Sequence, residues 1–118
     1  MSVVNCKVKY IRQNGYDNLE EWMKDNNNIY IGRKGIVFIN KQRFPSESSP
    51  FCNIYKIGID GDRDEVIQKY KNYIVSKIKN EPSFKDQLLR LKNKNLGCWC
   101  SPDKCHGDVL LELIHEYS

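Results

Sequence analysis

The chain has 118 residues, enough for one compact domain with a single core and too few for two ordinary domains. Hydrophobic residues make up 40% of it and charged residues 29%, as in soluble globular proteins, and no run approaches the ~18 apolar residues of a membrane span. The net charge of +4 suits weak attraction to phosphates but lacks the dense basic stripe of a dedicated nucleic-acid binder. We therefore expect one domain over residues 1–118 with no membrane partner.

The first residues, MSVVNCKVKYIRQ, do not resemble an export signal, because Asn5, Lys7 and Lys9 interrupt the apolar segment. This favours an intracellular, cytoplasmic protein whose sulfur is reduced. The chain has five cysteines, an odd number, which argues against a disulfide framework and leaves thiol or metal chemistry open.

The first third of the chain predicts strands around one short helix. Residues 2–12 alternate apolar and polar positions and predict a strand. A helix follows, capped by Asp17 or Asn18 and ended by the asparagine run at 26–28. Residues 29–39 are rich in β-branched side chains and predict two strands joined by a tight turn, or one bent strand.

The middle of the chain predicts a loop and then two helices. Residues 40–53 contain two prolines and no helical period, which indicates a long surface loop. The segment from Ile54 then predicts a short strand followed by a turn from Gly58 to Gly61. Asp62, three residues before Glu65, predicts the cap of the clearest helix. The apolar stripe of that helix consists of Val66, Ile67, Tyr70, Tyr73, Ile74 and Ile78. A second helix is predicted to begin at Pro82.

The C-terminal segment predicts a short strand over 94–100 and a closing helix from Cys105. Because strands and helices alternate here, we expect an α/β domain with a mixed or parallel sheet flanked by helices, Rossmann-like in arrangement. The loop SPDKCHGD, residues 101–108, then lies at the carboxyl end of a strand and the amino end of a helix. Ligands bind at that position in open α/β sheets.

Three interpretations fit the cluster of sulfur around that loop. Strand alternation places Cys98 and Cys100 on one face, and buried cysteines of that kind are common in cores. A second interpretation is zinc, with Cys98, Cys100, Cys105 and His106 as ligands, or Cys52 in place of one of them. Their spacing differs from that of common zinc fingers, since adjacent residues on a helix point about 100° apart.

The third interpretation is a reactive or binding site. Cys105 would lie at a helix N-terminus, where backbone N–H groups lower a thiol pKa and attract anions. His106 precedes the apolar residues Val109 and Leu110 by three and four positions, so we expect it to point inward and to act as a base or a hydrogen-bond donor. Cys105 or Cys98 is then the candidate nucleophile.

The chain resembles the family called domain of unknown function 4326, small proteins common in phages, bacteria and large DNA viruses. The resemblance runs from Val3 to Ile114 and rests on YIGR at 30–33, YKIGIDGDRDEVIQKY at 55–70 and LGCWCSPDKCHGDVL at 96–110. One loop departs from the family pattern, because this chain has SPFCNIYKIG where members typically have SKWGNPFKIG. The family name implies no reaction.

The resemblance implies a set of motif residues: Arg33, Asn53, Lys56, Asp60, Arg63, Cys98, Cys100, Cys105, His106 and Asp108. Simpler roles are open for several of them. The two arginines have the alternative of pairing with surface carboxylates. The alternative role of Asp108 is to stabilise a helix dipole, and the alternative role of Asp60 is to form a turn with Gly61.

Together these observations predict a pocket for a phosphate-bearing ligand, a nucleotide or a nucleic-acid end, with no resident cofactor. The candidate catalytic residues are Cys98, Cys105 and His106. The candidate ligand-binding residues are Arg33, Asn53, Lys56, Asp60, Arg63, Cys100 and Asp108. Two alternatives are a non-enzymatic zinc-stabilised module and an interaction protein of a virus or phage. Convergence of Arg33, Lys56 and Arg63 on one pocket would favour the phosphate interpretation.

Overall fold

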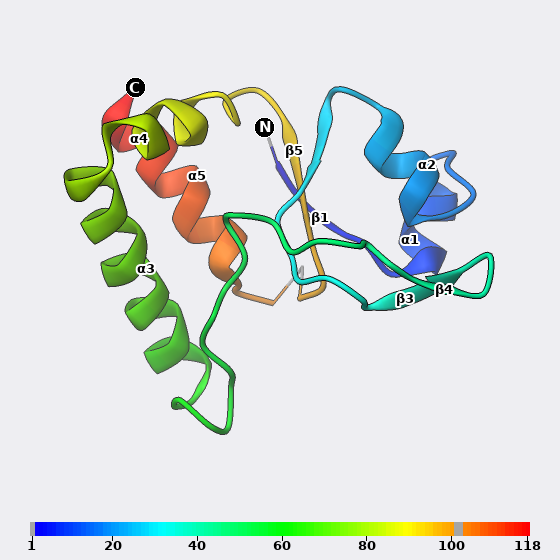
Figure 1. Ribbon diagram of the computed structural model, residues 1–118, viewed down its shortest axis with the longest axis horizontal. Helices are drawn as coiled ribbons and strands as arrows, with labels where there is room; N and C mark the ends of the chain where they lie inside the picture. The colour runs from blue at the N-terminus through cyan, green and yellow to red at the C-terminus, as the bar shows by residue number, and fades with distance from the viewer. Residues whose placement is uncertain (1, 101–102) are drawn as a thin grey trace.

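The protein was analysed as a computed structural model, which describes residues 2–100 and 103–118. A parallel sheet of three strands, β1 (Ser2–Asn5), β5 (Asn95–Cys98) and β2 (Asn28–Tyr30), lies in the middle of the molecule in the order β1-β5-β2 (Figure 1). The prediction of an α/β domain with a parallel sheet flanked by helices is therefore confirmed. The likeness to a Rossmann fold stays a prediction, because three strands are too few to define a doubly wound order.

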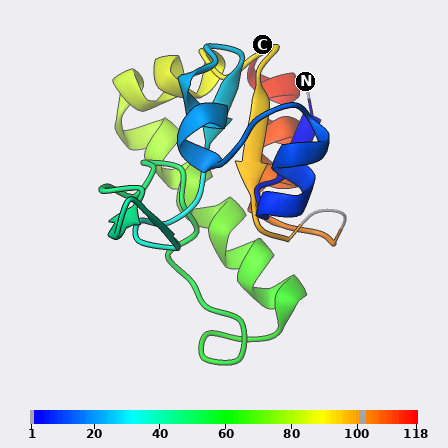
Figure 2. The same cartoon turned by 90° about the vertical axis from the view of Figure 1, so that its right-hand side faces the viewer.

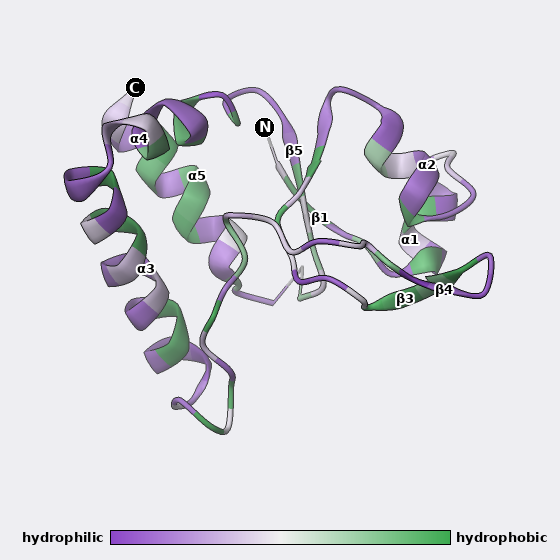
Figure 3. Ribbon diagram, in the orientation of Figure 1, coloured by the Kyte–Doolittle hydropathy of each residue, from purple (hydrophilic) through white to green (hydrophobic). Residues whose placement is uncertain are grey.

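Helices cover both faces of this sheet. The short helices α1 (Val8–Gln13) and α2 (Leu19–Lys24) lie on one side, and α3 (Arg63–Asn80), α4 (Pro82–Leu89) and α5 (His106–Tyr117) lie on the other (Figure 1). The hydrophobic residues of α5 line up beside α3 and the sheet (Figure 3). Among the described residues, no helix combines the length and the apolar character that crossing a bilayer requires.

The central strand β5 divides the core into two clusters by strand alternation. Leu96 and Cys98 are buried on the side of α3, α4 and α5, and Gly97 faces α1 and α2. A Cβ atom at Gly97 would lie 2.5 Å from Cys6 Sγ and 2.6 Å from the indole of Trp22. The close packing of α2 on the sheet therefore depends on a glycine at this position.

The first predicted strand, residues 2–12, is wrong in its second half. The strand ends at Asn5, whose side-chain Oδ1 accepts a hydrogen bond of 2.9 Å from the Lys7 N–H and turns the chain. Helix α1 follows and buries Ile11. The segment fits both patterns, since the apolar positions Val8 and Ile11 are also three residues apart, as on a helix.

Residues 29–39 contribute to two strands, as in the first of the two predicted alternatives, and not to one bent strand. The two strands do not pair with each other. Strand β3 (Val37–Ile39) pairs with β4 (Gln42–Phe44) in an antiparallel hairpin, so residues 42–44 are not the loop that was predicted. The turn residues Asn40 and Lys41 have φ values of 53° and 66°, the left-handed conformation that a two-residue hairpin turn requires. The hairpin stands apart from the central sheet (Figure 2).

The short strand predicted before Gly58 is absent, and that segment forms turns instead, whereas the turn predicted from Gly58 to Gly61 is present. The Asp60 carboxylate accepts a hydrogen bond of 2.8 Å from the Lys56 N–H, and the Gly58 N–H donates to the Gly61 carbonyl at 2.8 Å. These local bonds use the backbone groups that a strand would offer to a neighbour.

The predicted helix starts are confirmed. Asn18 caps α2 by accepting a hydrogen bond of 2.9 Å from the Glu21 N–H. Asp62 and Glu65 form a reciprocal capping box at the start of α3, and Pro82 occupies the first turn of α4. Caps are local in sequence, which is why the sequence predicts them well.

Candidate functional site

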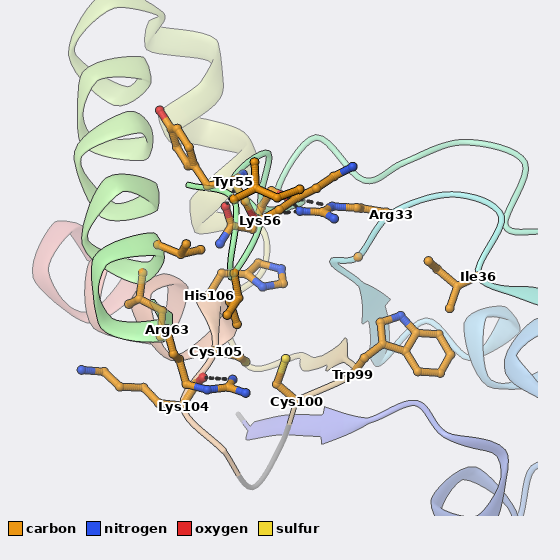
Figure 4. A pocket seen from close by; sticks show the side chains of 16 residues that line it. Arg33, Ile36, Tyr55, Lys56, Arg63, Trp99, Cys100, Lys104, Cys105 and His106 are labelled. Atoms are coloured by element: carbon orange, nitrogen blue, oxygen red, sulfur yellow. Dashed lines mark hydrogen bonds between the residues drawn. The ribbon is translucent and has the colours of Figure 1, made fainter. Parts of the chain in front are cut away.

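A pocket of about 530 Å³ opens where the segments that follow β2 and β5 meet the first turns of α3 and α5 (Figure 4). It therefore lies at the carboxyl ends of parallel strands, where the sequence places a ligand site. Its cationic lining residues are Arg33, Lys56, Arg63 and Lys104. Its apolar side is formed mainly by Ile36, Ile57, Ile59, Val66, Ile67 and Trp99. Cys100, Cys105 and His106 also line it.

Arg33 holds two distant segments of the pocket together. Its guanidinium donates to the Asn53 carbonyl from Nε at 2.9 Å and from Nη2 at 2.6 Å, and Nη2 also reaches the Tyr55 carbonyl at 2.9 Å. The partners in this structure are carbonyl groups and not the surface carboxylates considered above. Arg33 thus positions the turn that carries Lys56.

Two hydrogen bonds connect the backbone of Arg33 to Trp99 through the Tyr30 hydroxyl. Trp99 Nε1 donates to the Tyr30 hydroxyl at 2.9 Å, and that hydroxyl donates to the Arg33 carbonyl at 2.7 Å. Burial raises the pKa of Tyr30 to about 12, so the phenol stays protonated and keeps its donor role at neutral pH. These hydrogen bonds connect the YIGR motif, residues 30–33, to Trp99, the residue that follows β5.

The other cations come from three further segments. Arg63 Nη1 donates to the Lys104 carbonyl at 2.9 Å, which joins the start of α3 to the segment before α5. In Figure 4, Arg63 and Lys104 approach from one side and Arg33 and Lys56 from another, with Cys105 and His106 between them. The three basic residues singled out from the sequence therefore lie around one pocket. No carboxylate occurs among the lining residues that the structure describes.

Two predicted ligand residues lie outside the lining of this pocket. The Asp60 carboxylate closes the turn at Lys56, as its alternative role predicts. Asp108 accepts a hydrogen bond of 3.0 Å from the Cys105 N–H and forms part of the capping box of α5. Asn53 does line the pocket, while its side-chain Oδ1 accepts a hydrogen bond of 2.9 Å from the Tyr55 N–H.

The sulfur cluster is divided between the core and the pocket. Cys98 and Cys100 both pack with the cluster of α3, α4 and α5, and Trp99 packs with the opposite cluster, as strand alternation predicts. Cys98 is only 1% exposed and does not line the pocket, whereas Cys100 is half-buried and does. The Sγ atoms of Cys98 and Cys105 lie 3.0 Å apart.

The pKa of Cys105 shifts opposite to the direction expected from its place at a helix N-terminus. The hydrogen bond with Cys98 and burial raise the thiol pKa, and the bond of 3.3 Å from the Gly107 N–H to Sγ opposes this only in part. The prediction that the helix N-terminus lowers the pKa of this thiol is therefore wrong. Cys105 rests as a protonated thiol at neutral pH.

His106 points inward, as predicted. Because a carbonyl can only accept, the 2.8 Å contact between Nε2 and the Ile31 carbonyl places the ring proton on Nε2. The ring also packs edge-on against Tyr70, with the ring centroids 5.1 Å apart. Burial, helped by the charge of Arg33, lowers the pKa, so the ring is neutral at pH 7. Nδ1 has no hydrogen-bond partner among the described residues and can accept a proton.

Within residues 2–100 and 103–118, no three His, Cys, Asp or Glu side chains are arranged to hold a metal ion. His106 contributes Nε2 to Ile31 and would have to bind zinc through Nδ1. Zinc binding by Cys98, Cys100, Cys105 and His106, or with Cys52, stays a prediction.

Lys104 and Trp99 line the pocket but were not among the site residues predicted from the sequence. Lys104 directly precedes Cys105, so a lysine in the predicted ligand loop was an available signal. No sequence signal marked Trp99, because its role depends on the hydrogen bond with Tyr30, a residue far away in the chain.

The fold and the site define a small α/β protein with a basic pocket at the carboxyl end of its sheet. The chain belongs to the family Domain of unknown function (DUF4326), whose model matches residues 12–116. It is 33% identical over 55 residues to a protein of Enterobacteria phage T4 described as "Uncharacterized 12.4 kDa protein in nrdA-td intergenic region". That match covers 47% of this chain and 51% of the phage protein. No solved structure matches the chain.

Proposed function

We propose that the pocket binds a phosphate-bearing ligand, and that a nucleotide is favoured over a nucleic-acid end. The observation that carries this proposal is the lining itself, which includes four cationic residues and no carboxylate among the described residues. Arginine and lysine are the side chains that hold phosphate by charge-assisted hydrogen bonds. Without an acidic partner in the lining, their charge is available to a bound anion.

The apolar side of the pocket supports a nucleotide more than a free phosphate. Trp99 and Ile36 lie opposite Arg63 and Lys104 in Figure 4 and provide a surface for a planar base. A volume of about 530 Å³ lies within the range of small-ligand pockets, roughly 300–1,000 Å³.

The roles of the cations differ. Arg33 is committed to carbonyl groups and mainly shapes the site, and Arg63 uses only Nη1 on the Lys104 carbonyl. Lys56 and Lys104 are exposed and have flexible side chains that can follow a phosphate. The neutral His106 ring, with Nδ1 as an acceptor, is the best candidate for a proton-accepting group.

The proposal is tested by the thermal shift of the purified protein with ATP, GMP, inorganic phosphate and a 5′-phosphorylated oligonucleotide. We expect nucleotides to raise the melting temperature and the Lys56→Glu/Lys104→Glu variant to lose this effect. Each charge-assisted contact is worth about 1.5 kcal/mol or more, so the double variant should bind at least about 100-fold more weakly. The matched control is Lys79→Glu/Lys92→Glu, two exposed lysines that do not line the pocket.

The proposal fails if no phosphate compound shifts the melting temperature, or if the control pair loses binding equally. Stoichiometric zinc in the purified protein, with unfolding by a chelator, would instead identify the zinc-stabilised module.

A second candidate function, an interaction protein of a virus or phage, is favoured by the isoleucines of the turn segment before α3. Ile54 and Ile57 are each 52% exposed and Ile59 is 77% exposed. Under this candidate, Ile57→Ser/Ile59→Ser would abolish partner capture, and the lysine double variant would retain it.

A further inference from the structure

We propose that Cys98 and Cys105 form an oxidisable pair, which a hydroperoxide that enters the pocket converts to a disulfide. This inference does not depend on what the pocket binds, because it concerns the sulfur of Cys105, which lines the pocket, and the sulfur of Cys98 next to it. The pair joins the end of β5 to the residue that caps α5.

The distance between the two sulfurs favours a covalent bond. Their separation is 3.0 Å, and a disulfide bond is about 2.05 Å long, so a movement of about 1 Å closes it. Two sulfurs bound to the same tetrahedral zinc, each at about 2.3 Å, would lie about 3.8 Å apart. The observed pair is closer than a shared metal requires.

The backbone holds both cysteines in place. The Cys98 carbonyl accepts a hydrogen bond of 2.8 Å from the Cys6 N–H, as an extension of the sheet. The Cys105 N–H donates to the Asp108 carboxylate at 3.0 Å, and Cys105 Sγ accepts from the Gly107 N–H at 3.3 Å. Both thiols are therefore pre-positioned, with little entropy left to lose when the bond forms.

The pocket gives an oxidant access to one of the two sulfurs. Cys105 lines the pocket although it is 3% exposed overall, and Cys98 lies behind it. Hydrogen peroxide therefore reaches Cys105 first. The thiolate attacks one peroxide oxygen, the O–O bond breaks, and the other oxygen leaves as water after taking up a proton, which yields a sulfenic acid.

Cys98 completes the reaction. Its sulfur attacks the sulfenic sulfur of Cys105, the S–O bond breaks, and the oxygen leaves as a second water with the thiol proton. In the balance, one hydrogen peroxide and two thiols give one disulfide and two waters. Because Cys105 rests as a thiol, we expect the rate to rise about tenfold per pH unit around neutrality.

The experiment uses the full chain with Cys100→Ser, treated with hydrogen peroxide, alkylated, digested with trypsin and analysed by mass spectrometry. Cleavage after Lys94 and Lys104 separates the peptide 95–104 from the peptide 105–118. Without Cys100, a bridge between these peptides identifies Cys98 and Cys105 as its partners. We expect this bridge, an intact mass lower by about 2 Da, and reversal by dithiothreitol.

Cys98→Ala is the second variant and should abolish the bridge, while the melting temperature of oxidised Cys100→Ser should exceed that of its reduced form. The proposal is overturned if oxidised Cys100→Ser shows no bridge. If the wild type forms a bridge that Cys100→Ser lacks, the partner of Cys105 is Cys100 and not Cys98.

Discussion

At the scale of single residues, His106 shows how an inward position changes the chemistry of a side chain. Its ring is held between the Ile31 carbonyl and Tyr70, and burial lowers its pKa below the ordinary value of 6.5. The sequence predicts the inward direction from helical spacing. It does not predict the carbonyl partner, because Ile31 is 75 residues away in the chain.

This shift makes the stability of the fold depend on pH. Above pH 6.5 the His106 ring is neutral in both the folded and the unfolded protein. Below pH 6.5 the unfolded chain binds a proton at this ring, whereas the folded protein binds it only at a lower pH. The free energy of unfolding should therefore fall as the pH is lowered through 6.5 toward the lowered folded pKa. Urea unfolding at pH 7.5 and pH 5.0 measures this loss.

His106→Gln should reduce that loss, because the amide keeps a donor for the Ile31 carbonyl and does not titrate. His115→Gln, at an exposed histidine near the end of α5, is the matched control for the substitution itself. Equal effects of the two substitutions would contradict the assignment.

At the scale of elements, the capping box at the start of α5 decides where the site lies. The Asp108 carboxylate binds the Cys105 N–H, so the helix begins at His106 with Cys105 at its cap. The comparable box of Asp62 and Glu65 starts α3 beside the same pocket. Both boxes join residues three apart and are local features, but only the box of Asp62 and Glu65 was predicted from the sequence.

We expect Asp108→Ala to lower the free energy of unfolding by about 1 kcal/mol, since it removes one side of the cap. The affinity for a phosphate-bearing ligand should change little, because the carboxylate does not line the pocket. Denaturant unfolding and ligand titration of the same variant separate the two roles. A large loss of affinity at unchanged stability would restore Asp108 as a ligand residue.

At the scale of the whole molecule, Arg33 connects segments that are 20 and 22 residues apart in the chain. It holds the turn that precedes α3 against the end of β2, and so closes one side of the pocket. The β3–β4 hairpin is inserted between these two segments without joining the central sheet (Figure 2).

Arg33→Lys should loosen this connection while the charge is kept. A lysine cannot reach both carbonyl groups with a planar fork, and the loss of one charge-assisted hydrogen bond, about 1.5 kcal/mol, speeds local opening about tenfold. Amide hydrogen exchange of residues 53–60 measures this. Arg43→Lys, at an exposed arginine of the hairpin, is the control that should leave these amides unchanged.

The sequence by itself determined the elements whose signals are local. The caps at Asn18 and Asp62 and the apolar stripes of the helices fix four helices, and the short apolar run at 94–100 predicts β5. The cluster around Cys105 and His106 was also placed correctly at a strand-to-helix connection. These features need only neighbours within about one or two helical turns.

Only the tertiary structure decided which of these residues meet. Whether residues 8–13 form a strand or a helix, and whether residues 37–44 join the sheet, depends on partners far along the chain. The placement of the four cations around one pocket, the contact of Cys98 with Cys105 and the direction of the Cys105 pKa shift likewise come from packing. The physical reason is that burial and charge are properties of the assembled surroundings of a group, which no single stretch of sequence contains.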